Sequence, residues 1–217
     1  MFRVKICGLT DPRDARLIQA GGADAIGLNF YEKSRRFVSA DRALAILAEL
    51  AKSVQRVGVF VNATDDEVCR MYDHLQLDLI QLHGDEPPEY LLSLGGRPVV
   101  RAFRLGPAGV APINEYLDQC RALDVVPHAL LIDAHQPGVY GGTGVTADWD
   151  LLARQRSELN QLPLILAGGL RTENVAEAIA KVQPQAVDTC SGVESPSGLK
   201  SAELVNSFVA AASAVLR

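Results

Sequence analysis

Short apolar runs alternate with stretches of helical periodicity along the whole chain. Eight of these runs have the length and β-branched content of buried strands. They are Val4–Cys7, Ala25–Phe30, Arg56–Val61, Leu77–Leu82, Pro98–Phe103, Ala129–Asp133, Leu164–Ala167 and Ala186–Cys190. Amphipathic stretches of helical period lie between them, at 12–20, 40–51, 64–75, 173–181 and 201–216. The pattern predicts a regular alternation of strand and helix.

Two of the predicted helices begin with recognisable capping residues. Asp11 precedes Pro12, which is the order of an N-cap and a first-turn proline. Thr64 stands three residues before Glu67, which is the spacing of a capping box. These signals support helix starts at both positions.

Eight strand–helix units in 217 residues predict a single-domain (β/α)8 barrel that spans residues 1–217. The strands show little polar alternation, as expected when both faces of a sheet are covered. An open doubly wound sheet is the alternative, but no G-x-G-x-x-G follows the first strand. The glycine- and proline-rich segment 136–144 is too short to separate domains, and we interpret it as a functional loop.

Composition narrows the classes of function. The apolar content of 48% is enough for a sizeable core, and the net charge of −5 without a basic stripe argues against a nucleic-acid partner. No apolar run approaches the roughly 20 residues of a membrane span, and no secretory signal is recognisable, so we expect a cytoplasmic protein. The four cysteines form no C-x-x-C pair and lack histidines at ligand spacing, which favours free thiols over a metal site.

Two reactive side chains come at the ends of predicted strands. Cys7 ends the first strand and Asp133 ends the sixth. In a barrel of parallel strands, the C-terminal strand ends meet at one mouth, where the chemistry takes place. A thiol and a carboxyl group at this mouth can act as a base and an acid.

Three consecutive loops carry glycine where a strand gives way to a helix. They are Gly141–Gly144, Gly168–Gly169 and Ser191–Gly192. Glycine lets the backbone approach an anion closely, and barrels of this type often bind phosphate at the loops after strands seven and eight. Tight turns without a ligand are the alternative, but three such loops in succession favour a phosphate site.

Seven sequence blocks together resemble the phosphoribosylanthranilate isomerase family. They are Lys5–Thr10, Lys33–Val38, Val57–Asn62, Gln81–Glu86, Gly141–Gly144, Leu166–Leu170 and Asp188–Glu194. The blocks that read K-I-C-G and Q-L-H-G-D-E are specific, whereas the glycine pairs alone are not. The resemblance implies a (β/α)8 enzyme of tryptophan biosynthesis.

The resemblance also implies roles for individual residues. The general base falls on Cys7, the general acid on Asp133 and a substrate-binding arginine on Arg36. The phosphate-binding backbone falls on Gly142, Gly168, Gly169, Ser191 and Gly192. The substrate is a small phosphosugar. It is an aminoaldose, which an Amadori rearrangement converts to an aminoketose. This chemistry requires neither a cofactor nor a metal.

Several polar neighbours of the predicted pair are given supporting roles. We assign His83 to substrate binding, with a structural or supporting role as the alternative, and expect Asp85 and Glu86 to cap the next helix. Lys5 shares a strand face with Cys7, and we hypothesise that it favours the thiolate. Asp188, on the last strand, can pair with Lys5 when the barrel closes, which would weaken this effect.

Two other functions compete with this one. The related aminoaldose isomerase of histidine biosynthesis, or an enzyme that serves both pathways, is expected to have aspartate in place of Cys7. A phosphosugar-binding protein without activity would need neither Cys7 nor Asp133. Because both residues are present, we favour the isomerase, as a monomer or a homodimer.

Overall fold

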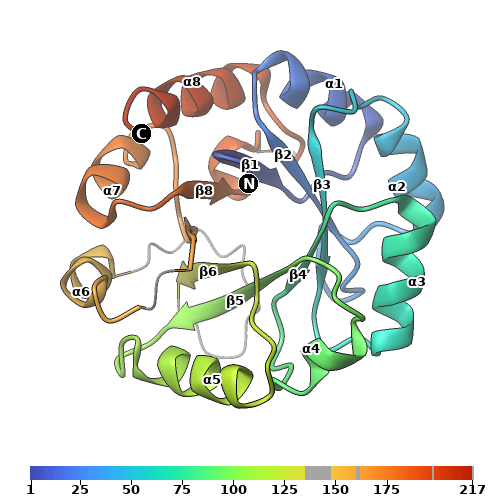
Figure 1. Cartoon of the computed structure of the whole chain (residues 1–217). Coiled ribbons are helices and arrows are strands. Elements are labelled where there is room, and N and C mark those ends of the chain that lie inside the picture. The colour runs from blue at the N-terminus through green and yellow to red at the C-terminus, as the bar shows by residue number, and fades with distance from the viewer. Residues whose placement is uncertain (135–147, 160–161, 197, 217) are drawn as a thin grey trace.

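The protein is a closed barrel of eight parallel strands in chain order. The computed structural model describes residues 1–134, 148–159, 162–196 and 198–216. The first strand is hydrogen-bonded to both the second and the last, which closes the barrel. The helices form an outer ring, and the two termini lie on the same side of the barrel (Figure 1). The predicted (β/α)8 fold is confirmed.

The strands and helices follow one another without interruption. The strands are β1 (Val4–Cys7), β2 (Ala25–Asn29), β3 (Gln55–Phe60), β4 (Leu79–Leu82), β5 (Val99–Leu105), β6 (Ala129–Ala134), β7 (Leu164–Leu166) and β8 (Ala186–Thr189). The helices are α1 (Pro12–Ala20), α2 (Ala40–Leu47), α3 (Asp65–Leu75), α4 (Tyr90–Ser93), α5 (Ala111–Ala122), α6 (Trp149–Gln155), α7 (Val175–Val182) and α8 (Ala202–Ser213). A short 3₁₀ helix, η1 (Ser191–Val193), follows β8.

The two predicted helix starts are confirmed by capping hydrogen bonds. The Asp11 carboxylate accepts from the Arg13 backbone N–H at 2.9 Å, and Pro12 opens α1. Thr64 Oγ1 accepts from the Glu67 N–H at 3.3 Å at the start of α3. Each side chain satisfies a backbone donor that the first helical turn leaves without a partner.

Apolar side chains fill two separate layers. The larger cluster lies between the strands and the helices and includes Ile6, Leu28 and Phe208. A smaller cluster fills the barrel interior with residues of modest size such as Ala25, Leu131 and Ile165. Because alternate strand residues point to opposite faces, most strands contribute to both layers, whereas β1 contributes Val4 and Ile6 to the larger cluster only. Among the described residues, no helix is long and apolar enough to cross a membrane.

Candidate active site

Cys7 is the last residue of β1 and is partly exposed at the barrel mouth. Gly27 on β2 is its register partner. A Cβ atom at Gly27 would lie only 2.5 Å from the Cys7 sulfur, so any larger residue there would displace the thiol. Glycine on the neighbouring strand therefore makes the space that the thiol occupies.

A buried ion pair lies directly beneath the thiol. Lys5, two residues before Cys7 on the same strand face, has its Nζ 2.8 Å from Asp188 Oδ2. The Lys5 side chain is completely buried, and Asp188 belongs to β8, which pairs with β1. The pair that the sequence suggested across the closed barrel is confirmed.

Burial decides the protonation of Cys7. Removal from solvent raises the pKa of the thiol, the Lys5 cation opposes this increase, and the Asp188 carboxylate adds to it. Lys5 thus acts in the predicted direction, but its effect is smaller than that of burial. Without substrate, the side chain is a thiol at neutral pH.

Asp133 lies near the end of β6, on the inner face, and is buried. Its Oδ2 lies 3.3 Å from His83 Nε2, without the alignment of a hydrogen bond. Gln81 Nε2 lies 3.0 Å from His83 Nδ1. When the amide nitrogen donates to Nδ1, the neutral imidazole carries its proton on Nε2, which faces Asp133. The structure therefore places His83 beside the predicted acid.

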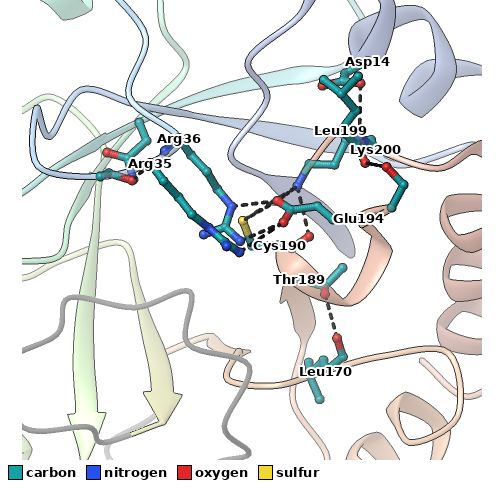
Figure 2. Close-up of polar contacts among 12 residues, drawn as sticks. Asp14, Arg35, Arg36, Leu170, Thr189, Cys190, Glu194, Leu199 and Lys200 are labelled. Atoms are coloured by element: carbon teal, nitrogen blue, oxygen red, sulfur yellow. Dashed lines mark hydrogen bonds and ion pairs between the residues drawn. The ribbon is translucent and has the colours of Figure 1, made fainter. Parts of the chain in front are cut away.

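Arg36 is buried and held by a carboxylate. Its Nε and Nη2 donate to Glu194 Oε1 and Oε2 at 2.7 and 2.9 Å. Lys200 Nζ donates to the same carboxylate at 2.9 Å (Figure 2). The Arg36 side chain lies over Gly8, whose positive φ of 75° and missing Cβ allow this close approach beside Cys7.

The loops after β7 and β8 contact each other. Thr189 Oγ1 donates to the Leu170 carbonyl at 2.7 Å, as Figure 2 shows. Gly168 and Gly169 have positive φ values of 84° and 63°, so both positions favour glycine. Ser191 and Gly192 belong to η1 at the start of the neighbouring loop. Four of the five predicted phosphate-binding residues thus lie on adjacent loops, and Gly142 lies outside the described residues.

The prediction that Asp85 and Glu86 cap the next helix is wrong. Helix α4 begins at Tyr90 and has no side-chain cap. Glu86 is buried and accepts from the backbone N–H groups of Asn62 at 2.7 Å and Gly84 at 3.1 Å. Asp85 pairs with a side chain of β5. The two carboxylates support the strand ends instead of a helix. Among the described residues, no group of three His, Cys, Asp or Glu side chains could hold a metal ion.

Sequence reasoning missed four residues that shape the site. They are Gly27, Gln81, Glu194 and Lys200. Glu194 and Gln81 lie inside blocks that carry the family resemblance, which was a usable signal. Gly27 and Lys200 have no local signal, because Gly27 depends on strand register and Lys200 acts through Glu194 on Arg36, which belongs to a distant part of the chain.

Comparisons with known proteins agree on one family. The family described as N-(5'phosphoribosyl)anthranilate (PRA) isomerase matches residues 4–211. N-(5'-phosphoribosyl)anthranilate isomerase of Azotobacter vinelandii is 46% identical, with 95% of both chains covered.

Two solved structures have a similar fold. One is a phosphoribosyl anthranilate isomerase in complex with reduced 1-(o-carboxyphenylamino)-1-deoxyribulose 5-phosphate. It has a TM-score of 0.81 and 35% identity, and covers 99% of this chain and 100% of its own. The other, described as monomers generated from the dimeric isomerase of Thermotoga maritima, has a TM-score of 0.79, 36% identity and the same coverage.

Proposed function

The chain belongs to the N-(5'-phosphoribosyl)anthranilate isomerase family of tryptophan biosynthesis, and we propose that Cys7 and Asp133 are its catalytic base and acid. The observation that carries this assignment is their common position on the inner face of one barrel mouth, where Cys7 is the last residue of β1 and Asp133 the last but one of β6. Asp188 lies between them, since it pairs with Lys5 beneath Cys7 and interacts electrostatically with Asp133.

The order of the two proton transfers follows from the state of the thiol. Asp133 first donates a proton to the furanose ring oxygen, which opens the ring to a protonated Schiff base. This cation then lies beside Cys7 and offsets the burial that keeps the thiol protonated. Cys7 releases its proton to solvent, and the resulting thiolate removes the proton from C2 of the sugar. The enolamine then tautomerises to the ketone. His83 faces the carboxylate that Asp133 leaves behind and is suited to stabilise it.

The remaining site residues bind the substrate. Arg36 is proposed to bind the anthranilate end, and the glycine loops after β7 and β8 are proposed to bind the phosphate. The neighbouring structure with a bound carboxyphenylamino phosphosugar supports a ligand of this chemistry. We further propose a monomer or homodimer in the cytoplasm, in line with the dimeric Thermotoga maritima relative.

Turnover of freshly prepared phosphoribosylanthranilate, followed by the loss of anthranilate fluorescence, tests the acid–base pair. We expect Cys7→Ala and Asp133→Ala each to lower kcat by about 10²–10⁴-fold, which is the usual contribution of one positioned acid or base. Cys69→Ala removes a thiol from α3, a helix that carries none of the proposed catalytic residues, and should leave kcat unchanged. Unaltered kcat in either mouth variant would contradict the assignment.

A further inference from the structure

Three buried charges form one cluster beside the thiol. Glu194 accepts from Arg36 through both carboxylate oxygens, and Lys200 Nζ shares Oε1 at 2.9 Å (Figure 2). Lys200 Nζ also donates to the carbonyl of Cys190 at 3.0 Å, which fixes the ammonium group beside the end of β8. The exposed fractions of the Arg36, Glu194 and Lys200 side chains are 9%, 5% and 0%. The cluster is therefore buried within the barrel mouth and is not an ion pair on the protein surface.

The cluster carries one net positive charge. Although burial raises the pKa of Glu194, the hydrogen bonds from Arg36 and Lys200 outweigh it and hold the pKa at about 2. Glu194 is thus a carboxylate at neutral pH, flanked by two buried cations and by the exposed Arg35. Without Lys200, Arg36 and Glu194 would form a neutral pair with little attraction for an anion.

Glu194 also determines which edge of Arg36 is available. It occupies the side edge of the guanidinium, formed by Nε and Nη2. Among the described residues, Nη1 donates no hydrogen bond, so the end edge formed by Nη1 and Nη2 can still take a planar carboxylate. Arg36 also interacts electrostatically with Cys7, so the guanidinium lies in the neighbourhood of the thiol.

We propose that Glu194 and Lys200 are positioning residues that select the substrate's carboxylate through Arg36. Glu194 orients the guanidinium, and Lys200 restores the positive charge that Glu194 neutralises. This inference rests on the proposed function, because it assumes that the anthranilate carboxylate binds Arg36.

The charge favours a carboxylate over a phosphate at this position. A phosphate monoester carries about −1.5 to −2 charges at neutral pH, whereas a carboxylate carries one. One negative charge matches the net charge of the Arg36–Glu194–Lys200 cluster. The phosphate has its own predicted site on Gly168, Gly169 and η1.

Two ligands that differ only in the carboxylate test the inference by calorimetry. One is reduced 1-(o-carboxyphenylamino)-1-deoxyribulose 5-phosphate, and the other is the same compound without the ring carboxyl group. We expect Lys200→Met to raise the Kd of the carboxylate ligand about tenfold, as for loss of a charged partner, and to leave the other ligand unaffected. Lys200→Arg should restore the affinity, because it keeps the charge.

Two further variants separate charge from packing. Glu194→Gln in the Lys200→Met background returns the net charge to +1 and should recover most of the lost affinity. Arg35→Met is the matched control, since Arg35 also faces Glu194, at 3.4 Å, but its side chain is 69% exposed. It should change neither Kd, because an exposed ion pair contributes little.

The outcomes distinguish the inference from the proposed function. The inference is supported if Lys200→Met weakens the binding of the carboxylate ligand alone. Intact binding of the other ligand shows that the variant is folded. An equal loss of affinity for both ligands, or no loss of affinity for either, would overturn the positioning role. It would leave the proposed function standing. A wild type that binds neither ligand would overturn the proposed function and the inference with it.

Discussion

At the scale of single residues, the reactivity of Cys7 depends on a balance of opposing neighbours. Burial and the Asp188 carboxylate raise the pKa of the thiol, while the Lys5 ammonium group lowers it. Because Lys5 lies 2.8 Å from Asp188, part of its charge is already neutralised. The ion pair therefore leaves Cys7 protonated in the free protein. The positive charge of the bound substrate can then lower the pKa of the thiol enough to form the thiolate.

Replacement of Lys5 tests this balance. Lys5→Met removes the only one of these three influences that favours the thiolate, so the pKa of Cys7 should rise further. The rise of kcat/KM with pH, which follows formation of the thiolate, should then shift to higher pH. Cys7 alkylation, followed by peptide mass spectrometry as a function of pH, measures the same shift directly.

A double variant controls for the carboxylate that Lys5→Met leaves unpaired and buried. Lys5→Met with Asp188→Asn removes both charges and should shift the alkylation profile less than Lys5→Met alone, because the Asp188 carboxylate also raises the thiol pKa. Equal alkylation profiles for wild type and Lys5→Met would contradict a role of Lys5.

His83 gives a second prediction at this scale. Its Nε2 faces Asp133 at 3.3 Å, and Gln81 holds the opposite ring nitrogen. His83→Ala should lower kcat at least about tenfold, the usual effect of losing a hydrogen bond to a charged group. KM should change little, because the interaction stabilises the carboxylate that forms after proton donation. A large change in KM with unchanged kcat would indicate substrate binding instead.

The sequence indicated the candidate catalytic residues better than their partners. Cys7 and Asp133 lie at or next to the ends of predicted strands, and Arg36 lies in a family block, so local pattern and resemblance were enough to select them as candidates. Gly27 lies against Cys7 on the neighbouring strand, and Lys200 reaches Arg36, far away in the chain, through Glu194. Their roles require the strand register and the side-chain contacts, which periodicity does not contain.

At the scale of secondary structure elements, all eight strands were predicted within two residues at each end. The differences have local causes. Leu77 was expected to begin a strand, but its N–H donates to the Tyr72 carbonyl and closes the end of α3. Helix α2 was expected to reach Ala51 but ends at Leu47, where hydrogen bonds tighten to three-residue spacing. Apolar periodicity continues through both segments, so it could not reveal these ends.

The contact between the loops after β7 and β8 gives a prediction about phosphate binding. A Cβ atom at Gly192 would collide with the backbone carbonyl of Leu170, which cannot move aside as a side chain can. Gly192→Ala should therefore separate the loops and raise the Kd for inorganic phosphate about tenfold or more, because steric overlap of this kind costs about 1–3 kcal/mol. Calorimetric titration with phosphate measures the change.

Gly198→Ala is the control for this substitution. Gly198 has a positive φ of 84°, but no atom lies within 4 Å of its ideal Cβ position. The variant should lose about 1 kcal/mol of stability through backbone strain and bind phosphate normally. Normal phosphate affinity in Gly192→Ala would show that the loop contact does not shape the site.

At the scale of the whole molecule, closure of the barrel assembles the site. Lys5 and Asp188 lie on the first and last strands and meet only because β1 pairs with β8. The Arg36–Glu194–Lys200 cluster likewise joins the loop after β2 to the segment after β8. These buried charges come together only in the closed barrel, so their protonation should be coupled to its stability.

Acid unfolding tests this coupling. The pKa of Glu194 is about 2 in the folded protein, below its ordinary value of 4.5. Stability from this carboxylate is therefore fully present above pH 4.5 and lost as the pH falls toward 2. Although burial opposes the shift, the pKa of Arg36 is raised further above its ordinary value by Glu194, and the Cys190 thiol, with a pKa of about 12, stays neutral over this range. Glu194 is thus the member of this group that titrates.

Urea unfolding of wild type and Glu194→Gln between pH 7 and pH 2.5 measures the contribution. The wild type should be more stable by about 3 kcal/mol at most near neutral pH, and the difference should shrink as Glu194 becomes protonated. Glu49→Gln removes an exposed carboxylate paired with Arg16 and should match the wild type throughout. A difference between wild type and Glu194→Gln that stays constant from pH 6 to pH 2.5 would show that the cluster does not couple protonation to folding.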